Sequence, residues 1–285
     1  MYILIFFQQL IASFTHIIAK ELTEIIEAPA LLFLRVAVSG IMFSIWIFIR
    51  RKKLKMIERK DIKTLLILSF LNIPLNQFLF LTSIHLTTAP NVALAYSLSP
   101  AFVFVIAILF FKETYYTAKL VGIFIAFTGA LFIIFERGVH LDSDYFLGNI
   151  LIMVASISWS FYTILGRDFS RKYGAVYSIG LTMIVGFFMY LPIFFIINPE
   201  MNIGELTVSN WAGVLYIGTI TSGVAYAMWY YALKHIEASR VAVFNNLQPV
   251  LTTILAVIFL SQDITITFIV GGVMIIVGVY ITQRS

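Results

Sequence analysis

The sequence contains no cysteine and little charge. Of its 285 residues only 12 % are Asp, Glu, Lys or Arg, whereas 61 % are hydrophobic and the mean hydropathy is +0.98. The missing cysteine excludes disulfide bonds and thiol chemistry. An ordinary soluble domain has roughly 45–50 % apolar residues. The composition therefore indicates an integral membrane protein.

The motifs of known hydrolase and nucleotide-binding sites are also missing. The sequence has no HExxH, no GxSxG and no glycine-rich phosphate loop. Its 4 histidines are scattered over separate predicted elements. We therefore expect no catalytic residues, no metal site and no cofactor. The basic run from Arg50 to Lys55 suits a loop that faces anionic lipid headgroups, so we expect no nucleic-acid partner.

Long apolar runs recur along the whole chain. Each is near or above the ~18 residues that cross a bilayer, and none alternates apolar and polar residues as a barrel strand does. Charged and Pro/Gly-rich breaks separate ten runs, which predict helices over residues 2–20, 29–49, 64–84, 89–111, 118–135, 147–166, 175–197, 208–233, 238–260 and 264–283. The predicted fold is all-α and integral to the membrane, with ten transmembrane helices.

Basic residues fall on alternate loops of this arrangement. If the N-terminus is cytoplasmic, 16 of the 19 Lys and Arg residues lie in cytoplasmic loops, the exceptions being Lys20, Arg35 and Arg137. Nine of the 14 acidic residues lie outside. This is the bias that the positive-inside rule requires of an even number of spans. We expect a multi-pass protein of the cell (inner) membrane with cytoplasmic N- and C-termini.

The two halves of the sequence share a pattern. An offset of 149 residues lays Pro100 on Pro249 without gaps and also pairs four glycines. These pairs are Gly122 with Gly271 and Gly129 with Gly278. The repeat unit holds five helices, so its second copy enters the membrane the other way up, as in many secondary transporters. We expect two inverted five-helix repeats, residues 1–140 and 145–285.

Four motifs carry a resemblance to a known family. They are FLRVAVSG at 33–40, NVALAYSLSPAFVFVIAILFFKET at 91–114, ISWSFYTILGR at 157–167 and YAMWYYALKHIEASRVAVFNNLQPVLTTILAVIF at 226–259. Through their order and spacing, the chain resembles the EamA-type branch of the drug/metabolite transporter superfamily over nearly its full length. The resemblance implies that helices one, three, four, six, eight and nine enclose a central substrate cavity, while helices five and ten pack at the periphery. It also implies export as the direction of transport.

Polar side chains in the predicted helices should face protein or an aqueous cavity, because hydrocarbon offers them no partner. On the ninth helix, Asn245 and Gln248 share a face. They either line the cavity or bind this helix to its neighbours, and both roles stay open here. The candidate substrate-binding residues are Gln9, Ser13, His16, Asn72, Asn76, Tyr96, Ser99, Trp159, Tyr162, Tyr226, Trp229, Tyr230, Asn245 and Gln248.

Several residues are expected to shape the helices instead. Pro74, Pro100 and Pro249 each remove a backbone donor and should kink their helices. Arg35 lies inside the second helix, where we expect a structural role, either snorkelling outward or bridging helix ends. The aromatic candidates are expected to wall the cavity, with core or interfacial packing as the alternative. The paired glycines suit close helix packing, within one chain or across a homodimer.

These expectations converge on a secondary transporter. The predicted cavity holds no Asp or Glu and is uncharged, amide-lined and aromatic-walled. It suits neutral, zwitterionic or amphipathic organic solutes, such as amino acids, metabolites or drugs, better than phosphate esters. Alternating access by rocking of the two halves is the expected mechanism. The alternative is a non-transporting membrane receptor or scaffold, which predicts no substrate-sized cavity.

The charge bias makes the topology testable. In whole cells carrying the variant Lys55→Cys, an impermeant maleimide applied from outside should not label the protein, because the loop at residues 50–63 is cytoplasmic. The same reagent should label it after the cells are permeabilised. Since the sequence has no cysteine, the introduced thiol is the only one in the chain. Labelling of intact cells would reverse the predicted topology.

Overall fold

The computed structural model describes residues 1–87, 92, 95–111, 116–136, 145–201, 204, 206–260 and 265–284. Within these ranges every regular element is helical. Seven helices are long and apolar enough to cross a membrane, and two shorter apolar helices cover Ala95–Phe110 and Thr117–Ile133. The chain is therefore an all-helical, multi-pass membrane protein, as predicted.

The helices follow the predicted ranges closely. Those that run without interruption are α1 (Tyr2–Thr23), α2 (Ala28–Arg50), α6 (Ser99–Phe111), α7 (Thr117–Glu136), α8 (Phe146–Tyr173), α9 (Ala175–Ile197) and α14 (Ile266–Arg284). Two short 3-10 turns, η1 (Arg51–Lys53) and η2 (Arg59–Asp61), lie between α2 and the next span. The first residues of the helix predicted over 89–111, and residue 264, lie outside the described residues.

One predicted boundary is wrong. The helix expected to end at residue 166 continues to Tyr173, because the charged residues that follow its apolar stretch are good helix formers and carry α8 beyond the hydrocarbon.

Three spans are composite, and each contains an irregular stretch. The first is α3 (Ile62–Phe70), η3 (Leu71–Gln77) and α4 (Phe78–Leu86). The second is α10 (Val208–Leu215), η6 (Tyr216–Ala225) and α11 (Tyr226–His235). The third is α12 (Ala238–Ala242), η7 (Val243–Asn246) and α13 (Leu247–Leu260). The stretches η3 and η6 are wide π turns, whereas η7 is a tight 3-10 turn.

The prolines account for part of this irregularity. Pro74 lies inside η3, where its missing N–H breaks the α-helical bonding ladder. Pro249 lies in the first turn of α13, directly after η7, and Pro100 is the second residue of α6. In the first turn of a helix a missing donor costs little, because that N–H has no partner within the helix. The wide turn η6 contains no proline.

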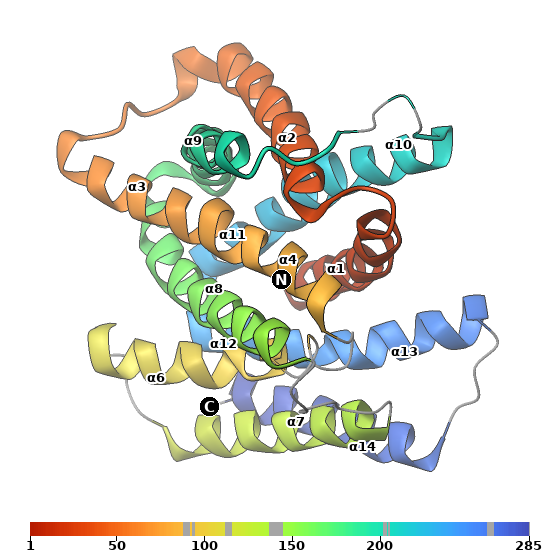
Figure 1. Cartoon of the computed structure of the whole chain (residues 1–285). Coiled ribbons are helices and arrows are strands. Elements are labelled where there is room, and N and C mark those ends of the chain that lie inside the picture. Colours follow the sequence, from red (N-terminus) through yellow and green to blue (C-terminus); the bar gives the residue numbers. More distant parts are fainter. Residues whose placement is uncertain are drawn as a thin grey trace.

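Helices α7 and α14 lie side by side along the lower edge of Figure 1. Their glycines allow this close approach. A Cβ on Gly122 would lie 2.7 Å from the carbonyl oxygen of Gly278, and one on Gly129 would lie 2.5 Å from that of Gly271. No side chain fits at these distances. The paired glycines therefore face each other within one chain, and this stripe is not free to contact a second copy.

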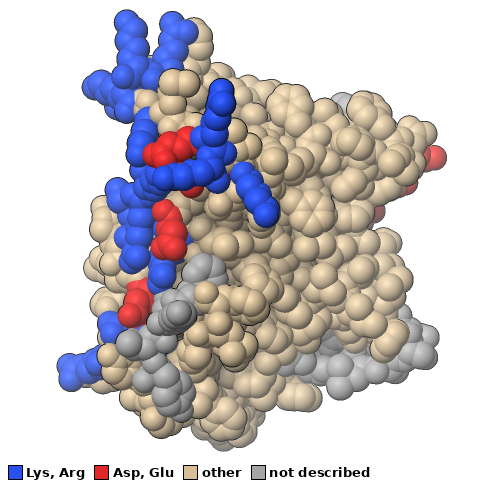
Figure 2. Space-filling view, turned by 90° about the vertical axis from the view of Figure 1, so that its left-hand side faces the viewer, with Lys and Arg blue, Asp and Glu red and all other residues tan. Residues whose placement is uncertain are grey.

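Lysine and arginine side chains gather along one side of the molecule, with acidic side chains among them (Figure 2). Among the basic residues, Lys172, near the end of α8, contacts Asp61 at 2.5 Å and Glu58 at 2.8 Å. Hydrogen bonds from Lys172, Lys55 and Lys60, in that order, lower the pKa of Glu58 to about 2, so this carboxylate stays charged at physiological pH. A second pair joins Lys119 of α7 to Glu237, between α11 and α12. Both sets of contacts join segments that are far apart in the sequence.

The glycine contacts predict the effect of a single methyl group. Gly271→Ala should lower the melting temperature of the purified protein, since its Cβ would lie 2.6 Å from the Gly129 carbonyl oxygen. Overpacking of this kind costs about 1–3 kcal/mol. The neighbouring variant Gly272→Ala is the matched control, because nothing lies within 4 Å of its Cβ. Equal melting temperatures for the two variants would contradict this packing.

Candidate functional site

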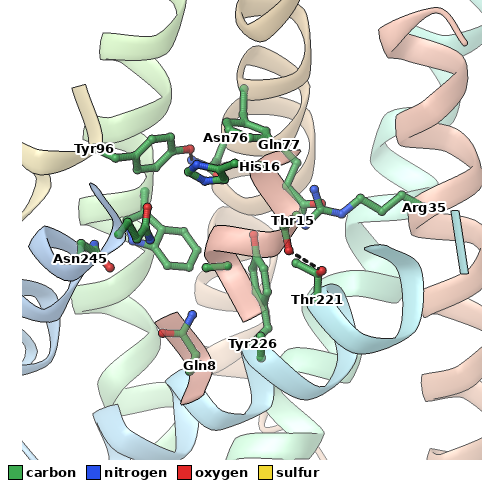
Figure 3. Close-up of a pocket in the computed structure, with 15 residues that line it drawn as sticks. Gln8, Thr15, His16, Arg35, Asn76, Gln77, Tyr96, Thr221, Tyr226 and Asn245 are labelled. Carbon is green, nitrogen blue, oxygen red and sulfur yellow. Dashed lines mark hydrogen bonds between the residues drawn. The ribbon is translucent and has the colours of Figure 1, made fainter. Parts of the chain in front are cut away.

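A cavity of about 80 Å³ lies between helices from both ends of the chain (Figure 3). The N-terminal half lines it with Gln8, Ala12, Thr15, His16, Arg35, Asn76, Gln77, Phe80 and Tyr96. The C-terminal half lines it with Trp159, Thr221, Ala225, Tyr226, Asn245 and Gln248. Small-molecule pockets usually measure roughly 300–1,000 Å³. A bound organic solute would therefore need the surrounding helices to move apart.

One wall of the cavity is held by a chain of amide hydrogen bonds. Gln9 Nε2 donates to Asn245 Oδ1 at 2.9 Å, and Gln248 Nε2 donates to Gln9 Oε1 at 2.9 Å. Asn245 Nδ2 in turn donates to Ser99 Oγ at 2.8 Å. These bonds join α1, α6 and the η7–α13 span. Asn245 and Gln248 thus serve both roles left open by the sequence, since they line the cavity and also bind helices together.

A second wall centres on Asn76, in the wide turn η3. Its Nδ2 donates to the carbonyl oxygen of Ala155 at 2.8 Å and to Tyr96 Oη at 3.0 Å. Asn72, one turn earlier, accepts a bond of 2.9 Å from Gln77 Nε2 and contacts the Met183 sulfur, and it does not line the cavity. The wide turn thus points two of its amides, Asn76 and Gln77, at the cavity and one at the protein interior.

The third irregular span contributes hydroxyl groups. Thr221, in η6, lies 2.7 Å from Thr15 of α1, oxygen to oxygen, as the dashed line in Figure 3 marks. All three irregular stretches, η3, η6 and η7, therefore supply polar residues to the cavity. Irregular turns of this kind are frequent at functional sites.

The position of Arg35 contradicts two expectations, an outward-snorkelling side chain and an uncharged cavity, while its bond to Ser222 joins α2 to η6. Its side chain does not snorkel outward, because the residue is only 3 % exposed, lines the cavity, and donates from Nε to Ser222 Oγ at 2.8 Å. The cavity is consequently not uncharged. The physical reason is that α2 packs against η6, whose Ser222 offers an acceptor at the depth of Arg35.

The aromatic candidates divide into two groups. Trp159 and Tyr226 line the cavity with their rings 5.4 Å apart. Trp229, Tyr162 and Tyr230 are buried behind them. Trp229 packs on Trp159 with the ring centres 5.4 Å apart, and Tyr162 packs on Tyr230 at 5.3 Å. Along α8 and α11 this second group lies between the cavity residues and the basic helix ends.

Half of the candidate substrate-binding residues therefore meet at the cavity. Those that line it are His16, Asn76, Tyr96, Trp159, Tyr226, Asn245 and Gln248. Those that lie outside its lining are Gln9, Ser13, Asn72, Ser99, Tyr162, Trp229 and Tyr230. Ser13 is fully buried and donates to the Gln9 carbonyl oxygen at 2.9 Å. Of the residues outside the lining, Gln9, Asn72 and Ser99 hydrogen-bond to lining residues, and Tyr162 and Trp229 pack on Trp159.

The candidate set missed several lining residues. They are Gln8, Ala12, Thr15, Gln77, Phe80, Thr221 and Ala225. Gln77 could have been identified from the sequence, since it is an amide near Pro74 in an apolar run. Thr15 and Thr221 were harder to identify, because a threonine in a membrane helix often bonds to its own backbone and need not face a cavity. Among the described residues, no group of three or more His, Cys, Asp or Glu could hold a metal ion.

Comparison with known proteins identifies the family of this chain. The sequence pattern of the EamA-like transporter family matches residues 1–135 and 146–284. The chain belongs to that family. It is thus an EamA-type member of the drug/metabolite transporter superfamily, and the predictions of a membrane transporter and of a protein that is not an enzyme are confirmed by family membership.

Several relatives are transporters by name. The chain is 25 % identical to the uncharacterized transporter YyaM of Bacillus subtilis over 78 % of this chain and 73 % of that protein. It is 26 % identical to an uncharacterized transporter of Archaeoglobus fulgidus over 96 % of this chain and 94 % of that protein. A WAT1-related protein of Arabidopsis thaliana is 24 % identical over 98 % of this chain and 83 % of that protein.

One solved crystal structure has the same fold. It matches 99 % of this chain and 96 % of its own, with a TM-score of 0.80 and 17 % sequence identity. At that identity the likeness extends to the fold alone.

The amide network predicts different effects on stability for substitutions of two neighbouring glutamines. Gln9→Leu should lower the melting temperature, since it leaves Asn245 Oδ1 and Gln248 Nε2 without their partner. Each lost partner costs about 1–3 kcal/mol. Gln8→Leu should be close to neutral, because Gln8 Oε1 is buried without a hydrogen bond. Thermal unfolding of both variants tests this, and a larger loss for Gln8→Leu would contradict the network.

Proposed function

We propose that this chain is a secondary transporter that exports small organic solutes by alternating access. Ten transmembrane helices form two inverted repeats, residues 1–140 and 145–285, and the solute binds in the central cavity between them. The observation that carries the proposal is that both halves line one polar, aromatic cavity inside a membrane-embedded helical protein. Family membership favours this function over that of a non-transporting receptor or scaffold.

The glycine contacts support the inverted repeat. At the offset of 149 residues, Gly122 corresponds to Gly271 and Gly129 to Gly278. The contact between Gly122 and Gly278 therefore becomes the contact between Gly271 and Gly129 when the two halves are exchanged. An axis that relates α7 to α14 in this way is expected of halves with opposite orientation in the membrane.

The contacts on the basic side support alternating access. Lys172 of the second half pairs with Asp61 and Glu58 of the first, and Lys119 of the first half pairs with Glu237 of the second. Beneath these ion pairs, the buried rings of Trp229, Tyr162 and Tyr230 separate the cavity from the basic ends of their helices. We propose that this side is closed in the conformation described, and that it opens when these contacts between halves break.

The basic side is the cytoplasmic one in this proposal, and both termini lie there, in the cell (inner) membrane. Lysine and arginine gather on one side of the molecule, as the positive-inside rule requires of the cytoplasmic face (Figure 2). A homodimer would need a surface other than the glycine stripe, which is occupied within the chain.

Transport into proteoliposomes tests the proposed site. Purified protein should accumulate at least one solute from a panel of radiolabelled amino acids, nucleobases and cationic drugs. Asn245→Ala should reduce the initial rate of uptake of that solute by about tenfold or more, since Asn245 both lines the cavity and accepts a hydrogen bond from Gln9. Expression in the membrane should be preserved.

The control is the adjacent residue. Asn246 is fully buried but does not line the cavity, so Asn246→Ala should retain the wild-type rate for the same solute. Equal rates for wild type and Asn245→Ala would remove this helix from the solute path. No uptake of any solute by wild-type protein would count against the transport proposal itself.

A further inference from the structure

Arg35 is a buried cation without a counter-charge. It is 3 % exposed, and its Nε donates to Ser222 Oγ at 2.8 Å. None of the ion pairs in the described part of the chain involves it. In Figure 3 its side chain reaches from α2 toward Thr15, Gln77 and Tyr226, so that hydroxyl and amide groups face the guanidinium.

A buried charge without a partner destabilises a fold, because the lost hydration is not replaced. Guanidinium carries five N–H donors. Ser222 accepts from Nε, and the Tyr226 hydroxyl also interacts with the group, but neither partner brings a negative charge. The remaining donors are on Nη1 and Nη2, at the end of a side chain that lines the cavity. A ligand in the cavity is thus placed to supply the missing negative charge.

Ser222 fixes the direction of this group. Its hydroxyl donates to the carbonyl oxygen of Ile217 at 2.9 Å while accepting from Arg35 Nε at 2.8 Å. Because the Ser222 hydroxyl both donates and accepts, it fixes the position of Arg35 Nε and thereby the plane of the guanidinium. The outer pair of nitrogens is the edge that binds a carboxylate through two parallel hydrogen bonds.

Two further groups at the cavity lack partners. Gln8 Oε1 and Gln77 Oε1 are buried acceptors with no hydrogen bond in the structure, and both residues line the cavity. The Gln77 amide is oriented by its Nε2, which donates to Asn72 Oδ1 at 2.9 Å. Free acceptors of this kind suit a ligand that carries an amine or a hydroxyl group.

We propose that Arg35 binds the carboxylate of the transported solute, and that the solute is a small monocarboxylic acid with an amine or hydroxyl donor. This inference rests on the proposed transport function and names its substrate class. One guanidinium balances one carboxylate, whereas a phosphate ester brings about 1.5–2 negative charges at neutral pH. The apolar part of such an acid would pack on the rings of Trp159, Tyr226 and Phe80, which also line the cavity.

The first test needs no ligand. Arg35→Met should leave the melting temperature of the ligand-free protein unchanged or raise it, since the variant removes an uncompensated charge while Ser222 keeps its bond to Ile217. Arg35→Lys, which keeps the charge but not the planar fork, should not be more stable than wild type. A clear fall in melting temperature for Arg35→Met would make Arg35 a structural residue and overturn the proposal.

The second test uses matched probes in thermal-shift and proteoliposome assays. Each set contains an acid, its carboxamide and the corresponding amine: phenylalanine, phenylalaninamide and phenethylamine, or leucine, leucinamide and isopentylamine. The phosphonate analogue of each acid completes the set. The acids should stabilise wild-type protein and be transported, and the other members should not. Arg35→Met should weaken acid binding by at least about thirtyfold. Arg51→Met, which changes an exposed arginine outside the cavity, should bind acids like wild type.

The outcomes separate this inference from the proposed function. Binding of amides or amines as strongly as acids, with Arg35→Met unaffected, would overturn the carboxylate assignment and leave the transporter standing. Preference for the phosphonates would replace carboxylate by a more highly charged anion and overturn the assignment as well. If no acid binds to or is transported by wild-type protein, the carboxylate assignment fails, and uptake of the nucleobases and cationic drugs decides separately on the proposed transport.

Discussion

Gln9 forms hydrogen bonds with Asn245 and Gln248 at the same time, and Asn245 in turn donates a hydrogen bond to Ser99. In a bilayer, a polar side chain has no water to turn to, so such groups must be satisfied within the protein. Asn245 and Gln248, which face the cavity, are therefore bound by Gln9, which does not. Gln77 is bound in the same way by Asn72. The cavity is polar because the helices around it are held together by polar groups. Removing the amides that face the cavity would leave the Gln9 side chain without hydrogen-bond partners and the Asn72 side-chain oxygen without a donor.

Arg35 differs from these amides, because its charge is not balanced within the described part of the protein. Gln9, Asn245 and Gln248 are paired with one another, whereas the guanidinium has hydroxyl partners and no negative charge among the described residues. Polar groups that are satisfied in the empty site stabilise its shape. A charge that is unsatisfied there stabilises nothing until a ligand arrives, and this difference separates the residues that build the cavity from the residue that we propose selects its solute.

Hydropathy predicted nearly all helix ranges, since a run of about 20 apolar residues has few alternatives in a membrane protein. It also placed His16, Asn76 and Asn245 at the cavity, because a polar residue in an apolar helix must face inward. Rotation of a helix about its own axis could not be predicted in the same way. Gln8 and Gln9 are adjacent in the sequence, yet the first lines the cavity and the second bonds to the neighbouring helices. The role of Arg35 depends on Ser222, 187 residues away, and on a wide turn without a proline to mark it.

The wide turns have a further consequence for motion. A π turn holds one more residue than the α-helical turn it replaces, so converting η3 or η6 to regular helix would rotate the following segment by about 100° without breaking the span. Asn76 and Gln77 lie within or at the end of one such turn, and Thr221 lies within the other. Each of these two turns, η3 and η6, thus holds one residue more than a regular α-helical turn would. A change of register there would exchange the groups that face the solute and would turn the helical segment that follows.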